Sequence, residues 1–287
     1  FPSNPDVVII GAGIAGLEAA RTLTNQGVTF IMIDANDRIG GRVHTNHSVF
    51  NVPFDTHAHW MRASPANPLL DHAKARGFEV YRDPGRVEYF VGNRKATDEE
   101  LTDLHQTDAL FNSRIKRSAL SSASGSDDNA RTALGEDFFA TSWGYTVASE
   151  YGVWDMAQDS ADWSPKSWWS SLDATSWFCT QGYGAVVTDY GRAAPVRLRT
   201  GASRIDWSGP DVAVTTSAGT IRARAAILTV SAGVLAAERI QFIPSLPPQK
   251  QQAIQDINMA LMNYIGLLFK KDIFGLGQDT YIYQQQH

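Results

Sequence analysis

The sequence DVVIIGAGIAG at residues 6–16 decides the fold. The apolar, β-branched run at 6–10 predicts a buried strand, and the glycines that follow it form the pattern GxGxxG. Residues 17–27 carry apolar side chains at helical spacing, and 28–33 predict a second buried strand. A strand, a glycine-rich turn, a helix and a strand in this order indicate the first part of a dinucleotide-binding α/β fold.

Each residue of the glycine pattern has its own physical role. Gly11 permits the tight turn, Gly13 lets the backbone approach a pyrophosphate, and Gly16 lets the helix pack on the strand. The N–H groups of the helix N-terminus, near Ala15, present partial positive charge to phosphates. Asp34 ends the second strand about 20 residues further on, where an acid binds ribose hydroxyls. The pattern predicts a dinucleotide site and leaves NAD and FAD both open.

A second signature, DRIGGRV at residues 37–43, follows directly. Together the stretches GAGIAGLEAARTL, DANDRIGGRVHT and FDTHAHW, in this order and spacing, resemble the flavin-containing amine oxidases, the group of monoamine, polyamine and L-amino-acid oxidases. The resemblance implies FAD as the cofactor. Gly41 would bring the backbone against it, and Arg42 would offer a planar set of donors to phosphate or to the flavin edge.

Two later stretches extend the resemblance. TQGYGAVV at 180–187 resembles the return of the chain into the nucleotide domain, and AAILTVSAGVL at 225–235 resembles the exit from it. The implied fold is α/β: a Rossmann-like FAD-binding domain of the GR2 type with an inserted α+β substrate domain, whose C-terminal part lies outside this chain. The expected order is FAD-binding at 1–85, helical substrate part at 86–178, FAD-binding return at 179–245 and start of the substrate sheet at 246–287.

Periodicity predicts the remaining elements. Helices are expected within 65–77 and over most of 97–174, where Trp168 and Trp169 are expected to pack between helices. The apolar side chains then alternate with period two, which predicts strands at Val196–Arg199, Ser203–Trp207, Val212–Thr216, Ile221–Val230 and Asn263–Phe269.

The chain departs from the family below the flavin, where the family usually has Gly-Ala-x-Trp. Ala58 is kept and is expected to contact the cofactor, but His57 replaces the glycine. Two interpretations remain open. Either a local rearrangement turns the ring of His57 away, or the ring lies beside the flavin and can move protons near neutral pH.

A second departure concerns a lysine that in many amine oxidases holds a water against flavin N5. Aligning residues 260–269 with that strand places Tyr264 in the lysine position, and we take Tyr264 as the candidate catalytic residue. A tyrosine hydroxyl can still hold a water. The substitution is equally compatible with a changed or lost activity.

The resemblance also suggests the substrate. Trp60 and Arg62 follow the flavin-facing segment, and both are taken as substrate-binding residues. Polyamine oxidases often have an acid at the position of Arg62, whereas a guanidinium suits the carboxylate of an amino acid. Ser203 is expected to contact the adenine through its backbone. The implied reaction passes a hydride from an amine or L-amino-acid carbon to flavin N5 and reduces O2 to H2O2. A flavin-dependent desaturase and a non-catalytic flavin-fold subunit remain as alternatives.

Composition excludes several other classes. The net charge is −5 with no basic block, so nucleic acid is not an expected partner, and no apolar run is long enough for a membrane span. No metal-ligand spacing is present, so no metal is expected. The resemblance makes a second chain or C-terminal fragment an expected partner, with a homo-oligomer possible. The first residue is Phe1, which suggests a processed or trimmed N-terminus and leaves export and the cytoplasm both open.

Overall fold

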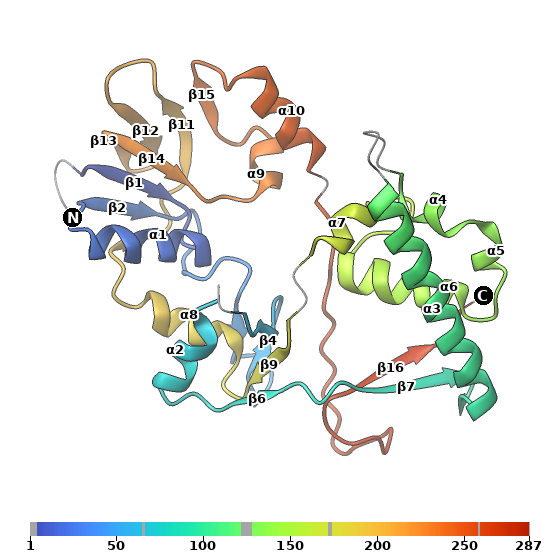
Figure 1. The fold of residues 1–287 in the computed structure, drawn as a ribbon. Helices are drawn as coiled ribbons and strands as arrows, with labels where there is room; N and C mark the ends of the chain where they lie inside the picture. The colour runs from blue at the N-terminus through green and yellow to red at the C-terminus, as the bar shows by residue number, and fades with distance from the viewer. Residues whose placement is uncertain (1–4, 65–66, 122–127, 172–173, 258, 287) are drawn as a thin grey trace. The chain divides into compact units, whose positions relative to one another are not determined.

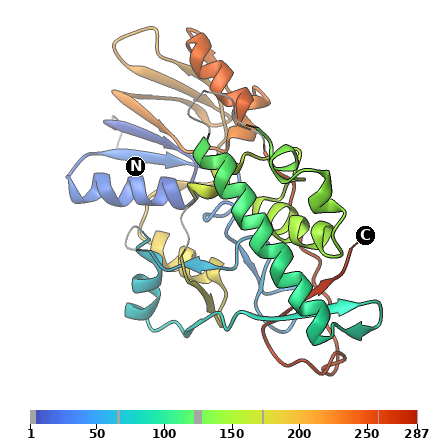
Figure 2. The same cartoon turned by 45° about the vertical axis from the view of Figure 1, so that its right-hand side comes forward.

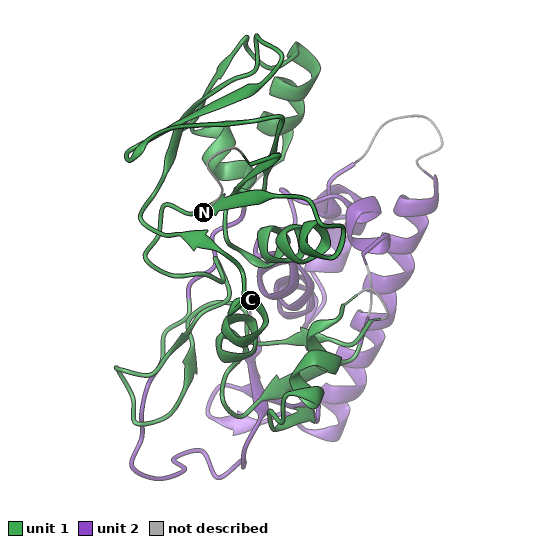
Figure 3. Cartoon of the chain, turned by 90° about the vertical axis from the view of Figure 1, so that its left-hand side faces the viewer, with its two compact units in different colours: residues 1–82, 175–259, 264–266 green, residues 83–174, 260–263, 267–287 purple. Residues whose placement is uncertain are grey.

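The structure is a computed structural model that describes residues 5–64, 67–121, 128–171, 174–257 and 259–286. The chain forms two compact units (Figure 3). Unit 1 comprises Phe1–Arg82, Thr175–Met259 and Tyr264–Gly266, and unit 2 comprises Asp83–Ala174, Ala260–Asn263 and Leu267–His287.

A four-stranded parallel sheet forms the centre of unit 1 (Figure 1). Its order is β10 (Val196–Arg197), β2 (Phe30–Ile33), β1 (Val7–Ile10) and β14 (Ala225–Leu228). Every residue of β1 and β2 is buried, as expected when both faces of a parallel sheet are covered. Helix α1 (Ile14–Asn25) connects β1 to β2. The predicted strand, turn, helix and strand are therefore confirmed, and with them the α/β class.

A second sheet covers one face of the parallel sheet. Its order is β13 (Gly219–Ala223), β12 (Val212–Thr216), β11 (Ala202–Asp206) and β15 (Gln241–Ile243). Its buried residues Ile205, Val214 and Ala223 form one hydrophobic cluster with Val8, Ile10, Ile31 and Ile33 of the parallel sheet. Two short helices, α9 (Ala232–Ala236) and α10 (Pro248–Asp256), flank β15 along the chain.

The prediction of one continuous strand at Ile221–Val230 was wrong. The chain leaves β13 at Ala223, passes the exposed Arg224, and enters β14 of the other sheet at Ala225. Alternating apolar residues specify a strand but not the sheet to which it belongs, so the pattern concealed the crossover.

The opposite face of the parallel sheet packs on helices and small strands. Helices α1, α2 (Leu69–Ala75) and α8 (Tyr183–Gly191) contribute to one core cluster that includes Ile9, Leu17 and Val186. The helix predicted within 65–77 corresponds to α2, and its residues 65–66 lie outside the described residues. The small strands form a hairpin, β3 (Thr45–Asn46) with β4 (Phe54–Asp55), and a sheet in the order β5 (Met61–Arg62), β9 (Ser176–Cys179), β6 (Val80–Arg82).

Unit 2 is mainly helical, as predicted for most of 97–174, of which 122–127 and 172–173 lie outside the described residues. The 24-residue helix α3 runs along unit 2 (Figure 2). The core of unit 2 contains Phe111, Ile115, Phe138 and Trp143. Its helical elements are α3 (Asp98–Ser121), α4 (Ala130–Leu134), α5 (Glu136–Phe139), α6 (Gly144–Ser149), the π-helical turn η1 (Glu150–Met156) and α7 (Pro165–Trp169).

The two tryptophans of α7 behave differently. The ring of Trp168 packs edge-on against Phe111 and Tyr151, with centroid distances of 5.9 and 5.4 Å, so its predicted packing role is confirmed. Trp169 is 41% exposed, and the ammonium of Lys116 lies 5.4 Å from its ring centroid. The prediction that Trp169 packs between helices was therefore wrong. At two consecutive helical positions, the side chains point in directions about 100° apart, so both cannot face the same core.

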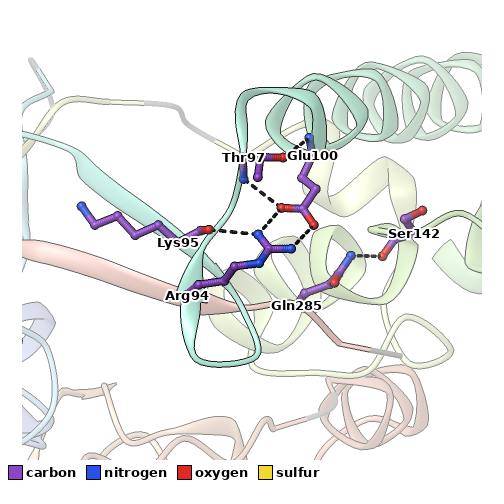
Figure 4. A network of polar contacts seen from close by, with 6 residues as sticks. All are labelled: Arg94, Lys95, Thr97, Glu100, Ser142 and Gln285. Atoms are coloured by element: carbon purple, nitrogen blue, oxygen red, sulfur yellow. Dashed lines mark hydrogen bonds and ion pairs between the residues drawn. The ribbon is translucent and has the colours of Figure 1, made fainter.

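A small sheet completes unit 2, in the order β16 (Thr280–Gln284), β7 (Arg86–Val91), β8 (Arg94–Lys95). Arg94 donates two hydrogen bonds of 2.7 Å to Glu100 at the start of α3, and this guanidinium lowers the pKa of Glu100 to about 2 (Figure 4). Glu100 also accepts from the backbone N–H of Thr97, which completes a capping box. The polar network therefore fixes β8 against the N-terminus of α3.

The predicted strand at Asn263–Phe269 was also wrong. Within the described residues this segment has no ladder partner, and its aliphatic side chains are exposed: Ile265 to 86%, Leu267 to 72% and Leu268 to 65%. A strand needs a neighbour for its backbone groups, and the apolar sequence alone does not supply one.

Substitution of Gly184 tests the close contact between α8 and the hairpin of β3 and β4. A Cβ at this position would overlap the backbone nitrogen of Thr45, whereas a Cβ at the loop residue Gly209 would meet nothing closer than 3.9 Å. We expect Gly184→Ala to lower the free energy of unfolding by about 1–3 kcal/mol through overpacking, and Gly209→Ala to leave it nearly unchanged. Urea unfolding of both variants measures this, and equal midpoints would contradict the contact.

Candidate cofactor site

A cavity of about 700 Å³ opens at the carboxyl ends of β1 and β2 in unit 1. This volume lies within the usual range for cofactor sites, and this position in an α/β sheet is where ligands commonly bind. Its lining comes mainly from four segments: the glycine-rich turn, the end of β2 with the Gly-Gly turn after it, the start of β11, and the link from β14 to α9. His57, Arg239 and Ile240 complete it.

The glycine-rich turn depends on two close approaches. Gly11 has φ +112°, and its carbonyl accepts a hydrogen bond of 3.0 Å from the hydroxyl of Thr229. A Cβ at Gly16 would overlap the carbonyl oxygen of Gly11. Gly13 differs, because among the described residues a Cβ there would meet only Gly41 Cα, at 3.9 Å. Gly11 and Gly16 are therefore required by the fold, and Gly13 keeps space free in the cavity.

The N-terminus of α1 faces this cavity with its backbone donors uncommitted. Among the described residues no side chain caps the helix, and its first turn contains no acidic residue. The N–H groups and the helix dipole therefore favour an anion, as a pyrophosphate requires.

Asp34 holds the turn together as well as lining the cavity. Its side chain is 9% exposed, and its Oδ2 accepts from the backbone N–H of Ala12 at 2.7 Å while Oδ1 accepts from that of Asn36 at 2.8 Å. An ionised carboxylate has about four acceptor sites, so two sites are left for hydroxyl donors.

The Gly-Gly turn lies directly against the glycine-rich turn. Gly40 and Gly41 have φ +96° and +58°, and Gly40 forms a parallel bridge with Gly13. The Gly40 N–H donates to Ala12 O at 2.8 Å, and Arg38 donates to Gly41 O at 2.8 Å. These bonds bring the two backbones together at the point where Gly13 leaves space.

A half-buried acid secures the hairpin that follows this turn. The carboxylate of Asp55 accepts from the Tyr183 N–H at 2.9 Å, from the Gly184 N–H at 3.4 Å, and from the Thr45 hydroxyl. These bonds cap the N-terminus of α8 and fix its position against β3. Burial lowers the pKa of the neighbouring His44, and the positive charge of Arg38 adds to the effect.

Most of the residues predicted to bind the cofactor lie together in this cavity. Its lining includes Gly11, Gly13, Ala15, Asp34, Gly41 and Arg42. Gly16 lies behind the turn as described above. Ala58 packs on the hydrophobic cluster of α1 and α8 and does not line the cavity, whereas its neighbour His57 does.

Ser203 does not line the cavity either. Its hydroxyl donates to Thr215 O at 3.3 Å on the exposed side of β11, and the preceding residue Ala202 lines the cavity instead. The pairing of β11 with β12 shifts register between Ala202 and Arg204, so the alternation of side chains is interrupted at Ser203. The expected contact of the Ser203 backbone with the adenine stays a prediction.

The predicted substrate and catalytic residues lie outside this cavity. The ring of His59 contacts both Trp60, at a centroid distance of 3.9 Å, and Tyr264, at 5.3 Å. Burial raises the pKa of Tyr264. Arg62 is exposed on β5, where its carbonyl accepts from Asn67 at 2.9 Å. The structure thus brings Trp60 and Tyr264 together around His59.

Several lining residues were not predicted from the sequence. They are Asn36, Arg38, Thr200, Gly201, Ala202, Thr229, Val230, Ser231, Arg239 and Ile240, together with flanking apolar residues. The stretch 225–235 had been singled out by its resemblance, but its place at the cavity depends on the parallel pairing of β14 with β1.

Within the described residues no group of three His, Cys, Asp or Glu side chains suits a metal ion, and no helix is long and apolar enough to cross a membrane.

Substitutions at Gly13 and Gly16 distinguish an effect on cofactor binding from an effect on folding. We expect Gly13→Val to keep the fold, because space is available, but to weaken FAD binding about a hundredfold or more, or about 2.7 kcal/mol, by occupying the pyrophosphate position. Gly16→Val should instead destabilise the protein. Circular dichroism and FAD titration of both variants distinguish the roles, and a Gly13→Val protein with undiminished FAD affinity would refute the site.

Comparison with known proteins identifies relatives over most of the chain. "Polyamine oxidase 2" of Arabidopsis thaliana is 26% identical over 300 residues, covering 93% of this chain and 59% of the relative. "Polyamine oxidase 5" of Oryza sativa subsp. japonica is 28% identical with the same coverage. "Lysine-specific histone demethylase 2" of Homo sapiens is 26% identical, with 93% and 35% covered.

Solved structures give the same fold. Putrescine oxidase, in its wild-type form bound to putrescine, superposes with a TM-score of 0.71 at 19% identity, covering 88% of this chain and 63% of that one. The chain thus spans about three-fifths of the length of the polyamine oxidases it matches. The family profile for flavin-containing amine oxidoreductases matches residues 14–281. The chain therefore belongs to the flavin-containing amine oxidoreductase family.

Proposed function

We propose that this chain supplies the FAD-binding part of a flavoenzyme that oxidises the carbon next to an amine nitrogen. The observation that carries the proposal is the cavity formed by the glycine-rich and Gly-Gly turns, in a chain that belongs to this family along almost its whole length. When bound, FAD would accept a hydride equivalent from that carbon and pass two electrons to dioxygen, which gives H2O2, while the imine product hydrolyses to a carbonyl compound.

The residues present fit this cofactor. The free N-terminus of α1 and the space at Gly13 suit the pyrophosphate, and Arg42 and Arg239 add positive charge to the lining. The carboxylate of Asp34 has acceptor sites left for ribose hydroxyls. The Gly-Gly turn excludes side chains at the closest approach of the two backbones.

We further propose that Tyr264 acts in catalysis by holding a water. Burial raises the pKa of its phenol, so the hydroxyl stays protonated at neutral pH and can both donate and accept. The edge-on contact with His59 fixes the orientation of the Tyr264 ring. Trp60, on the other side of the same histidine, would supply an apolar surface for the substrate.

The substrate class depends on Arg62. Several relatives of this chain are polyamine oxidases, whose substrates are cationic. An exposed guanidinium on β5 would repel such a substrate and would pair with a carboxylate. We therefore propose an L-amino acid with an apolar or aromatic side chain, in preference to a simple amine.

The active catalyst would include further polypeptide, either a second chain or a C-terminal continuation. Many large apolar side chains within residues 259–274 are exposed, among them Leu261, Ile265 and Leu267, and a contiguous exposed apolar patch is typical of a surface that another polypeptide covers. The relatives are also longer than this chain, which spans 59% of the polyamine oxidases.

Anaerobic reduction tests both the activity and the need for more polypeptide. We expect the intact protein to carry a flavin whose visible absorbance bleaches when an amine or amino acid is added without oxygen. The 287-residue chain alone should show little or no bleaching. A bound flavin in the intact protein that no such compound reduces would exclude amine oxidation. Full activity of the isolated chain would disprove the need for further polypeptide.

A comparison of L-phenylalanine with 2-phenylethylamine, which differ by the carboxylate, tests the role of Arg62. We expect a higher kcat/KM for the amino acid, and we expect Arg62→Met to reduce that preference about 10- to 100-fold, since a hydrogen bond to a charged group contributes about 1.5–3 kcal/mol. Arg222→Met, at an exposed position of β13, serves as the control. If Arg62→Met has unchanged selectivity, a simple amine becomes the preferred substrate class.

A further inference from the structure

His57 enters the cofactor cavity from a loop that is fixed on both sides. It lies between β4 and β5, and its side chain is exposed to the cavity that it lines. The preceding N–H, of Thr56, donates to His44 O at 2.9 Å, and the following N–H, of Ala58, donates to Arg42 O at 3.4 Å. These bonds hold the backbone on both sides of His57 beside the segment that follows the Gly-Gly turn, and His57 lines the cavity there.

Hydrogen bonding determines which ring nitrogen is free. The Thr56 hydroxyl lies 3.2 Å from His44 O and 3.0 Å from His57 Nδ1. Which atom donates in the contact with Nδ1 depends on the ring tautomer. Nδ1 is therefore engaged by Thr56, and Nε2 is the ring nitrogen left for a ligand, as acceptor or donor according to the tautomer.

Other polar side chains of the cavity are already engaged. The hydroxyl of Thr200 donates to Leu198 O at 2.9 Å, that of Thr229 donates to Gly11 O, and Arg38 donates to Gly41 O. Their donor groups therefore serve the protein backbone. His57 Nε2, by contrast, takes part in none of these bonds.

The position of His57 along the cavity lining indicates which part of FAD it meets. Asp34 and Asn36, before the Gly-Gly turn, suit the adenosine half, and Gly13 and Gly40 mark the pyrophosphate. The neighbours of His57, Thr56 and Ala58, are bonded to the segment after that turn, at His44 and Arg42. The riboflavin half has hydroxyls on its ribityl chain and an imide group on its ring, and both can form a hydrogen bond with an imidazole nitrogen.

We propose that Nε2 of His57 forms a hydrogen bond with the riboflavin half of FAD, and so gives this chain a cofactor contact that a glycine at the same position cannot make. The inference rests on the proposed function, since it requires FAD in the cavity. It assigns His57 to binding of the flavin-bearing half alone.

Competition between FAD and ADP tests the assignment, since ADP contains the adenosine and pyrophosphate but lacks riboflavin. The measurements are the Kd of FAD, from quenching of flavin fluorescence on the intact protein, and the Kd of ADP, from its competition with FAD. We expect His57→Ala to weaken FAD about tenfold, as for one lost hydrogen bond, and to leave ADP unchanged. His57→Gln, whose amide carries both a donor and an acceptor, should recover most of the affinity.

His47→Ala is the matched control, because His47 is an exposed histidine of the nearby hairpin that does not line the cavity. Both affinities should be unchanged in it. If His57→Ala binds FAD as tightly as the wild type, or loses FAD and ADP equally, the assignment is overturned while FAD binding stands. If the intact wild-type protein binds ADP but not FAD, the proposed function itself fails.

Discussion

The cofactor cavity depends on the absence of Cβ atoms where three backbone segments converge. The carbonyl of Gly11 lies in the space that a Gly16 side chain would occupy, and Thr229 closes the other side of Gly11. Gly40 then pairs with Gly13. Any side chain at the closest of these contacts would separate α1 from β1, and the helix N-terminus would no longer face the cavity. The position of every other lining group follows from this convergence.

Polar side chains support the same convergence from outside. Asp34 and Arg38 bind backbone groups of the two turns, and Asp55 caps α8 behind them. Each charged group satisfies backbone donors or acceptors that would otherwise be buried without partners. Because these residues maintain the turns in the absence of ligand, the cavity is preformed. FAD binding therefore carries only a small free-energy cost for ordering the protein.

The sequence predicted local features well and long-range ones poorly. The unit from residue 6 to 34 was predictable because glycine spacing, apolar periodicity and the terminal acid all act over short range. The division at Arg224 was missed because two strands of different sheets share one alternating pattern. Asn263–Phe269 has the pattern of a strand, but pairing needs a neighbour that the pattern does not specify. Likewise, the pattern does not specify the register shift of β11 beside Ala202, which lines the cavity.

The parallel sheet of unit 1 has a further consequence for how the protein is made. Val7 pairs with Phe30 on one side and with Ala225 on the other, so its two neighbours leave the ribosome almost two hundred residues apart. The whole of residues 83–174 is synthesised in between. The first strands therefore wait, with apolar faces uncovered, for a strand that closes a very long loop, and such closure is slow. Thr229, which completes the glycine-rich turn, arrives directly after that strand, so competence to capture the flavin is acquired late in synthesis, together with the closure of the sheet.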